Sequence, residues 1–449
     1  MDDRTRHLLT SAPAPLLIRL ATPNALAFTV QSSVSLAEVW FIGQLGTSAL
    51  ASIALAFPLL MLMQTMSGGA LGGAVTSAIA RALGAGDRDK AQRLIWHALA
   101  IAAAGSGLFL LLFLVFGWAL LAFLGGSGDI LEQSASYCLV LFAGGLFIWL
   151  LGVVGAVFRG MGNMKLPALL MIASALIQVP LSGILVLGLF GAPQLGIVGA
   201  AVSAVISSLL ISAVMLTLLG RPGRVIQLDA RAISFSTALF HDIFKVALPA
   251  SLSPLLTILT IMVLTAMVAT FGEAALAGYG IGSRIEFLLI PLVFGIGAAM
   301  TSLVGLSIGA GNIARAERIG WTGSAFAAGL AGVVGLALAA FPEVWIYAFT
   351  NDPAAFDAAR SYIRIVGPFF AFQGLGLSLY FASQGAGTVT WPILATIVRV
   401  VLAVGGSWML AFWLDMGLQG VFIAAAGAMV TYGFLIAASL KLGAWRGQV

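Results

Sequence analysis

Long apolar segments follow one another along almost the entire chain. About twelve of them reach roughly 20 or more residues, the length that a helix needs to cross about 30 Å of hydrocarbon. Hydrophobic residues make up 61% of the chain and charged residues only 8%, so a water-soluble core could not hide its apolar surface. The sequence therefore predicts an all-α integral membrane protein with about 12 transmembrane helices. The expected spans are residues 16–42, 49–82, 94–124, 134–158, 166–189, 194–219, 244–271, 274–308, 314–341, 355–384, 389–414 and 418–443.

Lys and Arg side chains concentrate in alternate connections between these spans. The connections after spans 1, 3, 5, 7 and 11 contain neither residue, whereas those after spans 2, 4, 6 and 8 are basic. Because basic loops remain in the cytoplasm, both termini are predicted to be cytoplasmic in a multi-pass protein of the plasma (inner) membrane. Basic loops that touch anionic lipid are compatible with the same topology. The net charge of +5 is thus explained without a nucleic-acid partner.

The chain contains the same half twice. ALGAGDRDKAQRL, residues 82–94, returns as SIGAGNIARAERI, residues 307–319. Three further segments recur in the same order: LGTSALAS (45–52) as FGEAALAG (271–278), FRGMGNMKLPALL (158–170) as SQGAGTVTWPILA (383–395), and, more weakly, LGIVGAA (195–201) as MGLQGVF (416–422). Six spans in each half give parallel repeats related by an axis along the membrane normal. We expect one six-helix bundle over residues 1–220, a cytoplasmic linker over 221–243 and a second bundle over 244–449. A duplicated membrane protein can rock one half against the other, which points to transport.

The ordered motifs resemble one transporter family. Pro23 lies in the first span, Glu38 follows fifteen positions later, and FIGQLGTSALAS, GAGD, RGMG and IGAGN come next in order. This set is similar to the multidrug and toxic compound extrusion (MATE) family of the multidrug/oligosaccharidyl-lipid/polysaccharide flippase superfamily, over nearly the whole length. The resemblance implies two pseudo-symmetric six-helix bundles around a V-shaped cavity. It also implies multidrug efflux by antiport with H⁺ or Na⁺ through alternating access, which in a cell exports xenobiotics and confers antibiotic resistance.

The same resemblance implies the partners. They are cationic or amphipathic small-molecule substrates and membrane lipid, with the protein as a monomer and with no cofactor beyond the coupling ion. The alternative is a flippase for a lipid-linked precursor, because a related branch of the superfamily shares the architecture. An Arg-rich cavity would favour that alternative, and Arg284 and Arg399 are the main candidates for one.

Glu38 is the first candidate for cation coupling. An ionised carboxylate is costly within an apolar span, so it should hold a cation, such as Na⁺, or carry a proton. The family usually has Asp at this place, and Glu keeps the charge while adding one methylene. Alternatively, the side chain extends to the outer interface and has no role in transport.

Gln178 and Ser182, in the segment IQVPLSG, are candidate neutral partners of Glu38. They lie where related transporters commonly show Asn and Asp, and their spacing of four places both on one helix face. Pro180 between them frees a backbone carbonyl. Gln178 and Ser182 could therefore supply oxygen ligands beside Glu38, or they could merely satisfy a local helix bend.

Three further charges form a second set of candidates, for substrate or charge-network roles. Arg284 and Glu286 lie within GSRIEFLLIP of span 8 and, being two positions apart, should find partners on other spans. Arg399 in span 11 could pair with Glu286 or Glu38, or could fix span 11 in place. A fixed cation in the cavity would repel cationic drugs, which favours the structural role for Arg399.

An enzyme is not expected. The three histidines, His7, His97 and His241, are scattered, and the sequence contains no HExxH or similar catalytic pattern. The single cysteine, Cys138, excludes an internal disulfide and a cysteine metal cage.

Overall fold

The structure is a computed structural model that describes residues 3–223 and 225–448. In this part of the chain, 11 helices are long and apolar enough to cross a membrane, and there are up to 12 spans if one bent helix pair is a single span. The prediction of an all-α membrane protein with about 12 spans is thereby confirmed.

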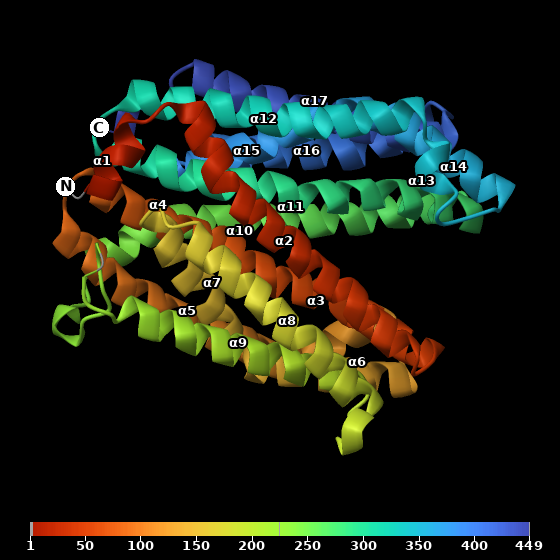
Figure 1. Cartoon of the computed structure of the whole chain (residues 1–449). Helices are drawn as coiled ribbons and strands as arrows, with labels where there is room; N and C mark the ends of the chain where they lie inside the picture. The colour runs from red at the N-terminus through yellow and green to blue at the C-terminus, as the bar shows by residue number, and fades with distance from the viewer. Residues whose placement is uncertain (1–2, 224, 449) are drawn as a thin grey trace. The chain divides into compact units, whose positions relative to one another are not determined.

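The helices of the first half run from α1 to α9 (Figure 1). They are α1 (Asp3–Thr10), α2 (Pro13–Gly43), α3 (Thr47–Gln64), α4 (Gly72–Gly84), α5 (Arg88–Phe123), α6 (Gly128–Ala143), α7 (Gly145–Gly160), α8 (Lys165–Leu187) and α9 (Ile197–Leu219). A π-helical segment, Thr65–Leu71, joins α3 to α4 within one span.

The helices of the second half repeat this order from α10 to α17. They are α10 (Thr237–Ala269), α11 (Glu273–Gly309), α12 (Ile313–Ala340), α13 (Glu343–Ile346), α14 (Pro353–Val366), α15 (Phe370–Ala386), α16 (Thr390–Trp408) and α17 (Gly417–Lys441). Another π-helical segment, Met409–Trp413, extends α16.

The span expected at residues 134–158 is bent rather than straight. It consists of α6 and α7, which meet at Gly144 with an angle of 51°. A Cβ at Gly144 would lie 2.3 Å from a methyl group of Val205 on α9, so only glycine permits this approach. The Gly144–Gly145 pair at the bend is typical of the sequences at which helices kink.

The chain divides into two compact units. The first unit contains Leu26–Ala247 together with the amino-terminal residues up to Leu8, and the second contains Leu9–Ala25 together with the residues from Leu248 onward. One break falls between Leu8 and Leu9 in α1, and the other two fall inside α2 and α10, close to Pro23 and Pro249. Each half of the chain therefore contributes the start of its first long helix to the other unit. The division predicted at residues 220 and 244 follows the sequence repeat, and it stays a prediction.

The two repeats share turn geometry as well as sequence. Gly86 and Gly311, in the two GAG loops, both have positive φ, +80° and +72°, a region that glycine enters without steric cost. The next residue caps the following helix in both halves: Asp87 accepts from Lys90 N, and Asn312 accepts from Arg315 N. The repeated motif is therefore a tight turn that ends one span and begins the next.

Equivalent helices of the two repeats are also joined in the same way. In the first unit, Thr76 Oγ1 on α4 donates to Ala156 O on α7 at 3.0 Å. In the second unit, Thr301 Oγ1 on α11 donates to Phe381 O on α15 at 2.8 Å. Both threonines are buried, so each bond satisfies a polar group that would otherwise be costly inside a membrane protein.

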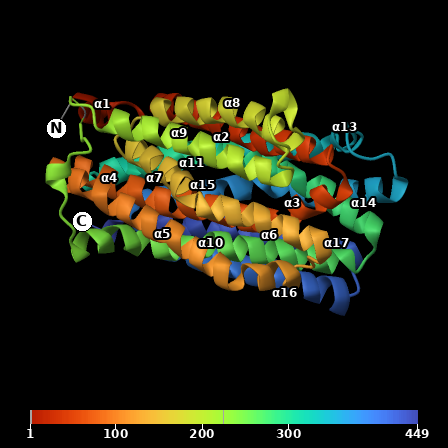
Figure 2. The ribbon, with the colours of Figure 1, turned by 90° about the horizontal axis from the view of Figure 1, so that it is seen from below.

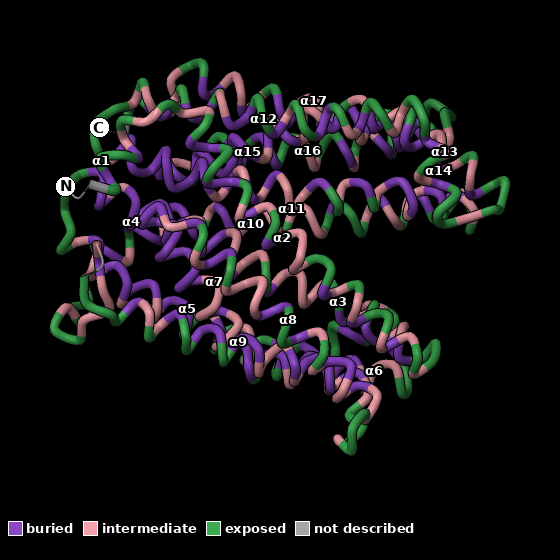
Figure 3. The backbone as a smooth tube through the Cα atoms, viewed as in Figure 1, coloured by how far each residue is buried: buried purple, intermediate pink, exposed green. Residues whose placement is uncertain are grey.

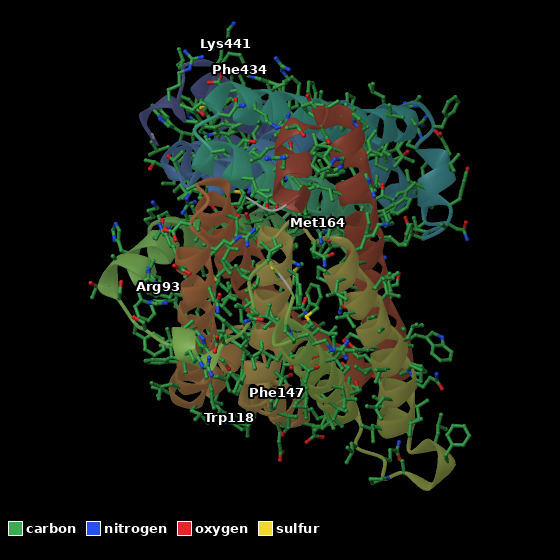
Figure 4. The ribbon with its side chains drawn as sticks, turned by 60° about the vertical axis from the view of Figure 1, so that its left-hand side comes forward. Arg93, Trp118, Phe147, Met164, Phe434 and Lys441 are labelled. Carbon is green, nitrogen blue, oxygen red and sulfur yellow. The ribbon has the colours of Figure 1, made fainter. Side chains whose placement is uncertain are left out.

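The first unit leaves apolar side chains exposed. Figures 1 and 2 show α5 beside α7 in the first unit, and buried and exposed turns alternate along α5 in Figure 3. The exposed positions of α5 include Leu111, Val115, Phe116 and Trp118, the last of which is labelled in Figure 4. An apolar surface of this kind suits contact with lipid rather than with water.

Candidate functional site

Glu38 lies inside the first unit, bonded to a side chain from another helix. The residue is on α2 and only 9% of its surface is exposed. Gln178 Nε2, on α8, donates a hydrogen bond to Glu38 Oε1 at 2.8 Å. The structure thus brings two of the predicted coupling residues into direct contact, and it does not extend Glu38 to the surface of the unit.

Ser207 on α9 is a third member of this site that sequence reasoning missed. Its Oγ donates to Gln178 Oε1 at 3.3 Å and also lies 3.1 Å from Ala204 O. Hydrogen bonds therefore run from α9 through α8 to α2. The signal that could have found Ser207 is the pair of serines four residues apart, Ser203 and Ser207, in an otherwise apolar span.

The orientation of the Gln178 amide bears on its predicted role. Its NH₂ group faces the Glu38 carboxylate, while its oxygen accepts from Ser207. A donor is what a carboxylate requires, and a hydrogen bond to a charged group is stronger than one between neutral groups. In this arrangement Gln178 is a donor to Glu38, and it would need to turn its amide to act as the predicted oxygen ligand.

Ser182 is fully buried on α8, one turn from Gln178. Its Oγ has no hydrogen-bond partner among the residues that the structure describes. A buried hydroxyl without a partner costs about 1–3 kcal/mol, so this oxygen is available to a small ligand. Tyr137 on α6 is also buried and interacts electrostatically with Glu38.

Glu286 is a second carboxylate within a span, but it does not lie at the position equivalent to Glu38, because it is on the second long helix of its half. It lies on α11 and accepts a short hydrogen bond from the Tyr362 hydroxyl on α14. Tyr362 is buried, and its ring packs edge-on against Tyr279 of α11, with centroids 5.5 Å apart. The partner of Glu286 is therefore on another span, as its spacing from Arg284 predicted.

Arg284 lies apart from this carboxylate. Its side chain is on an exposed turn of α11, and its guanidinium is 5.4 Å from the ring centroid of Phe349, which follows α13. A cation over an aromatic face is attracted by the ring quadrupole, so this contact accounts for the position of the charge.

Arg399 joins four helices of the second unit through neutral groups. It donates from α16 to Thr257 Oγ1 on α10 at 3.0 Å and to Gln373 Oε1 on α15 at 3.5 Å. Its guanidinium also lies 4.9 Å from the ring centroid of Tyr432 on α17. The charge of Arg399 acts on Glu286 through space, but the two residues are not bonded to each other in the contacts of the described chain. Of the two alternatives for Arg399, pairing with a carboxylate or fixing span 11 in place, the hydrogen bonds of the described chain are those to neutral side chains on neighbouring helices.

A cavity of about 440 Å³ opens in the first unit, at the end that lacks basic loops. Its polar lining comes from Ser48 on α3 and from Asp129, Glu132, Gln133 and Ser136 on α6. Glu38 is not among the lining residues. The unit therefore has an acidic recess in addition to the buried carboxylate.

Comparison with known proteins identifies the family. The MatE family model matches residues 23–184 and 249–409, one match in each half of the chain. The FAD transporter of Shewanella oneidensis is 28% identical over 85% of this chain and 84% of its own length. The probable multidrug resistance protein NorM of Thermotoga maritima is 26% identical over 91% of this chain and 88% of its own.

A solved structure agrees over the whole chain. It is a MOP superfamily transporter from Pyrococcus furiosus, for which a reversed polarity of the binding pocket was taken to suggest a different function. It is 25% identical, covers 99% of both chains and superimposes with a TM-score of 0.91. Together with the ordered motifs and the duplicated helical halves, these matches show that the chain is a multi-pass membrane transporter of the MatE family.

Proposed function

We propose that this transporter exports cationic or amphipathic small molecules in exchange for an entering cation, H⁺ or Na⁺, by alternating access. The observation that carries the proposal is the buried Glu38 carboxylate, held by one amide donor from Gln178. A buried acid that can be neutralised by a proton or a metal ion is the simplest device for coupling a cation gradient to movement. We place the protein in the plasma (inner) membrane, with both termini in the cytoplasm, as a monomer that needs only its coupling ion.

The arrangement around Glu38 supports a two-state site. When the carboxylate is ionised, the Gln178 NH₂ group stabilises it directly. When a cation neutralises Glu38, the Ser207 hydroxyl can donate to Ala204 O instead of Gln178 Oε1, which leaves the amide free to turn its oxygen toward the site. Ser182 Oγ is a further neutral oxygen for a bound Na⁺. Each state then has its own satisfied set of hydrogen bonds.

The second unit supports a role in cargo recognition. Glu286 offers a negative charge framed by the aromatic rings of Tyr279 and Tyr362, a combination that attracts organic cations. Arg399 is already engaged by Thr257, Gln373 and Tyr432, so it serves to hold α16 against its neighbours.

One observation favours a second candidate, an anionic cargo such as a lipid-linked precursor moved by a flippase. Among the described residues, the hydrogen-bond acceptors of Arg399 are the neutral side chains of Thr257 and Gln373, so no carboxylate is bonded to its guanidinium. The Shewanella relative is named an FAD transporter, and FAD is a phosphate-bearing anion. An anionic group could replace the neutral partners of Arg399 and gain a charge-assisted bond.

The test is export from liposomes that contain the purified chain. An ethidium-like cationic dye and FAD are each loaded, and Na⁺ and pH gradients are imposed separately. We expect the dye to leave under one of the two gradients. Glu38→Gln should insert normally but lose this driven efflux, while Glu273→Gln, a control on the exposed first turn of α11, should keep it. Driven dye efflux by Glu38→Gln at the original rate would remove Glu38 from the mechanism, and export of FAD but not of the dye would support the anionic alternative.

A further inference from the structure

Four charged side chains meet where α4, α5 and α10 approach one another in the first unit. Asp242 on α10 accepts from Arg81 Nη2 on α4 at 2.8 Å, from Lys90 Nζ on α5 at 2.9 Å and from Lys245 Nζ on α10 at 2.9 Å. We call these four residues the Asp242 cluster. The sequence pointed to the individual basic residues but not to their common carboxylate, because Asp242 is 161 positions from Arg81.

The Asp242 cluster carries more positive than negative charge. Three cations share one carboxylate, which leaves two positive charges without a counterion inside the cluster. Arg81 is well enclosed, with 13% of its side chain exposed, and it also bonds Ser77. Lys90 and Lys245 differ from it, since 36% and 37% of their side chains are exposed. The excess charge is therefore accessible, and it resides on the two lysines.

An ion pair with a purely structural role does not require three cations around one carboxylate. Asp242 and Arg81 already compensate each other, and each added lysine brings repulsion from the other two cations. An ammonium group has three donors, and in the described contacts each lysine directs one of them to Asp242. An external anion seated between the two lysines would relieve the repulsion and take up the remaining donors. The charge balance thus points to a missing anionic ligand.

The position of the cluster indicates where that anion comes from. Arg81 lies in the last turn of α4, Lys90 in the first turn of α5, and Asp242 in the second turn of α10, so the cluster is at the ends of membrane spans. Lipid headgroups occupy this level of the bilayer, and basic pockets between transmembrane helices bind anionic headgroups.

Contacts between α5 and the segment before α10 fix the helices that carry the Asp242 cluster. Trp96 Nε1 on α5 donates to Asp229 O at 2.9 Å, and the Ser236 backbone N–H donates to His97 Nε2 at 3.0 Å. His97 also packs against the rings of Phe235 and Phe240. Figure 4 labels Arg93, whose carbonyl oxygen lies 2.8 Å from His97 Nδ1. These contacts join the segment before α10 to α5. The helix ends that carry Lys90 and Lys245 are therefore ordered in the absence of a ligand, which lowers the entropy cost of binding one.

We propose that the Asp242 cluster binds the phosphate group of an anionic lipid headgroup, with Lys90 and Lys245 as its donors. The ends of α5 and α10 place the two ammonium groups beside Asp242, and the phosphate completes the charge balance of the cluster. The site is separate from Glu38 and Glu286, and it does not depend on the proposed antiport.

The experiment compares lipid binding to the purified full chain by native mass spectrometry. The probes are phosphatidylglycerol, which is anionic, and phosphatidylcholine, which is zwitterionic. We expect the wild type to prefer phosphatidylglycerol, and Lys90→Gln/Lys245→Gln to bind it about 30-fold more weakly, from the worth of two lysines near a lipid surface. Lys165→Gln/Lys441→Gln is the matched control, because it removes two exposed lysines elsewhere, one of them projecting from the end of α17 (Figure 4). Equal affinity of the two double variants for phosphatidylglycerol would overturn the proposal.

Asp242→Asn keeps the proposal testable if the lysine variant does not fold. Removing the carboxylate raises the net charge of the cluster from two to three, so the variant should bind phosphatidylglycerol more tightly than the wild type. Unchanged or weaker binding by folded Asp242→Asn would contradict an anion site. Competition with excess inorganic phosphate distinguishes a lipid headgroup from free phosphate as the source of the phosphate group. Displacement of bound phosphatidylglycerol supports recognition of the phosphate itself. Phosphate binding with no preference for phosphatidylglycerol over phosphatidylcholine would overturn the assignment to lipid.

Discussion

The Gln178 amide on α8 donates a 2.8 Å hydrogen bond to the Glu38 carboxylate on α2. The two residues are 140 positions apart in the chain, and both are buried in the first unit. This contact gives the buried charge its direct donor, so changes at either residue should affect both stability and coupling.

Removing the amide should impair coupling more than insertion. Gln178→Leu leaves Glu38 without its donor, and loss of a group that holds a cation-binding ligand typically costs about 10- to 100-fold in metal affinity or activity. We expect gradient-driven dye efflux from liposomes to fall by at least about tenfold. Gln133→Leu, a change of the same type in the acidic recess on α6, is the control and should stay near the wild-type rate. Equal effects of the two changes would argue against a special role for Gln178.

Ser207→Ala should destabilise the protein because it leaves Gln178 Oε1 buried with no donor from α9. The expected cost is about 1 kcal/mol, seen as a lower unfolding temperature in detergent, together with slower efflux. Ser203→Ala is closely matched, since Ser203 is equally buried on α9 but, within the described part of the chain, its hydroxyl donates to Ala200 O in its own helix. If Ser203→Ala has the larger effect on efflux, the chain of bonds through Gln178 is not what matters.

Tyr362→Phe should lower the stability of the second unit, because it removes the hydrogen bond to Glu286. The change removes a donor to a carboxylate, worth about 1.5–3 kcal/mol, while keeping the aromatic packing against Tyr279. We expect a lower unfolding temperature and an altered preference among cationic dyes. Tyr347→Phe, at an exposed tyrosine, should change neither measurement. An unaltered dye preference in folded Tyr362→Phe would limit Glu286 to a structural role.

The repeat predicts that substitution by alanine lowers stability equally at two equivalent glycines. A Cβ at Gly199 would lie 2.6 Å from the backbone of Leu185, and one at Gly420 would lie 2.7 Å from the backbone of Ala411. Substitution by Ala should cost about 1–3 kcal/mol at each site, because backbone cannot yield as a flexible side chain does. Thermal unfolding measures the effect, and Gly427→Ala, which meets nothing within 4 Å, is the neutral control. Loss of stability at only one of the pair would mean that the halves pack differently there.

Much of the architecture could be predicted because it is encoded locally. Runs of apolar residues determine the spans by their length alone. The repeated GAG loops coincide with the turns at Gly86 and Gly311, where positive φ suits glycine. The ordered motifs predicted the family, and the exceptional cost of a carboxylate in an apolar span singled out Glu38.

The tertiary structure alone decided which side chains meet. The bond from Ser207 to Gln178, the neutral partners of Arg399 and the three cations around Asp242 join residues on different helices. The angle of the bend at Gly144 likewise belongs to the packed structure. The physical reason is that a helix with apolar residues on all sides has no amphipathic pattern, so its sequence does not show which face it turns toward its neighbours. The rotation of each helix about its own axis, which aims each rare polar group, is set by close packing against neighbouring helices.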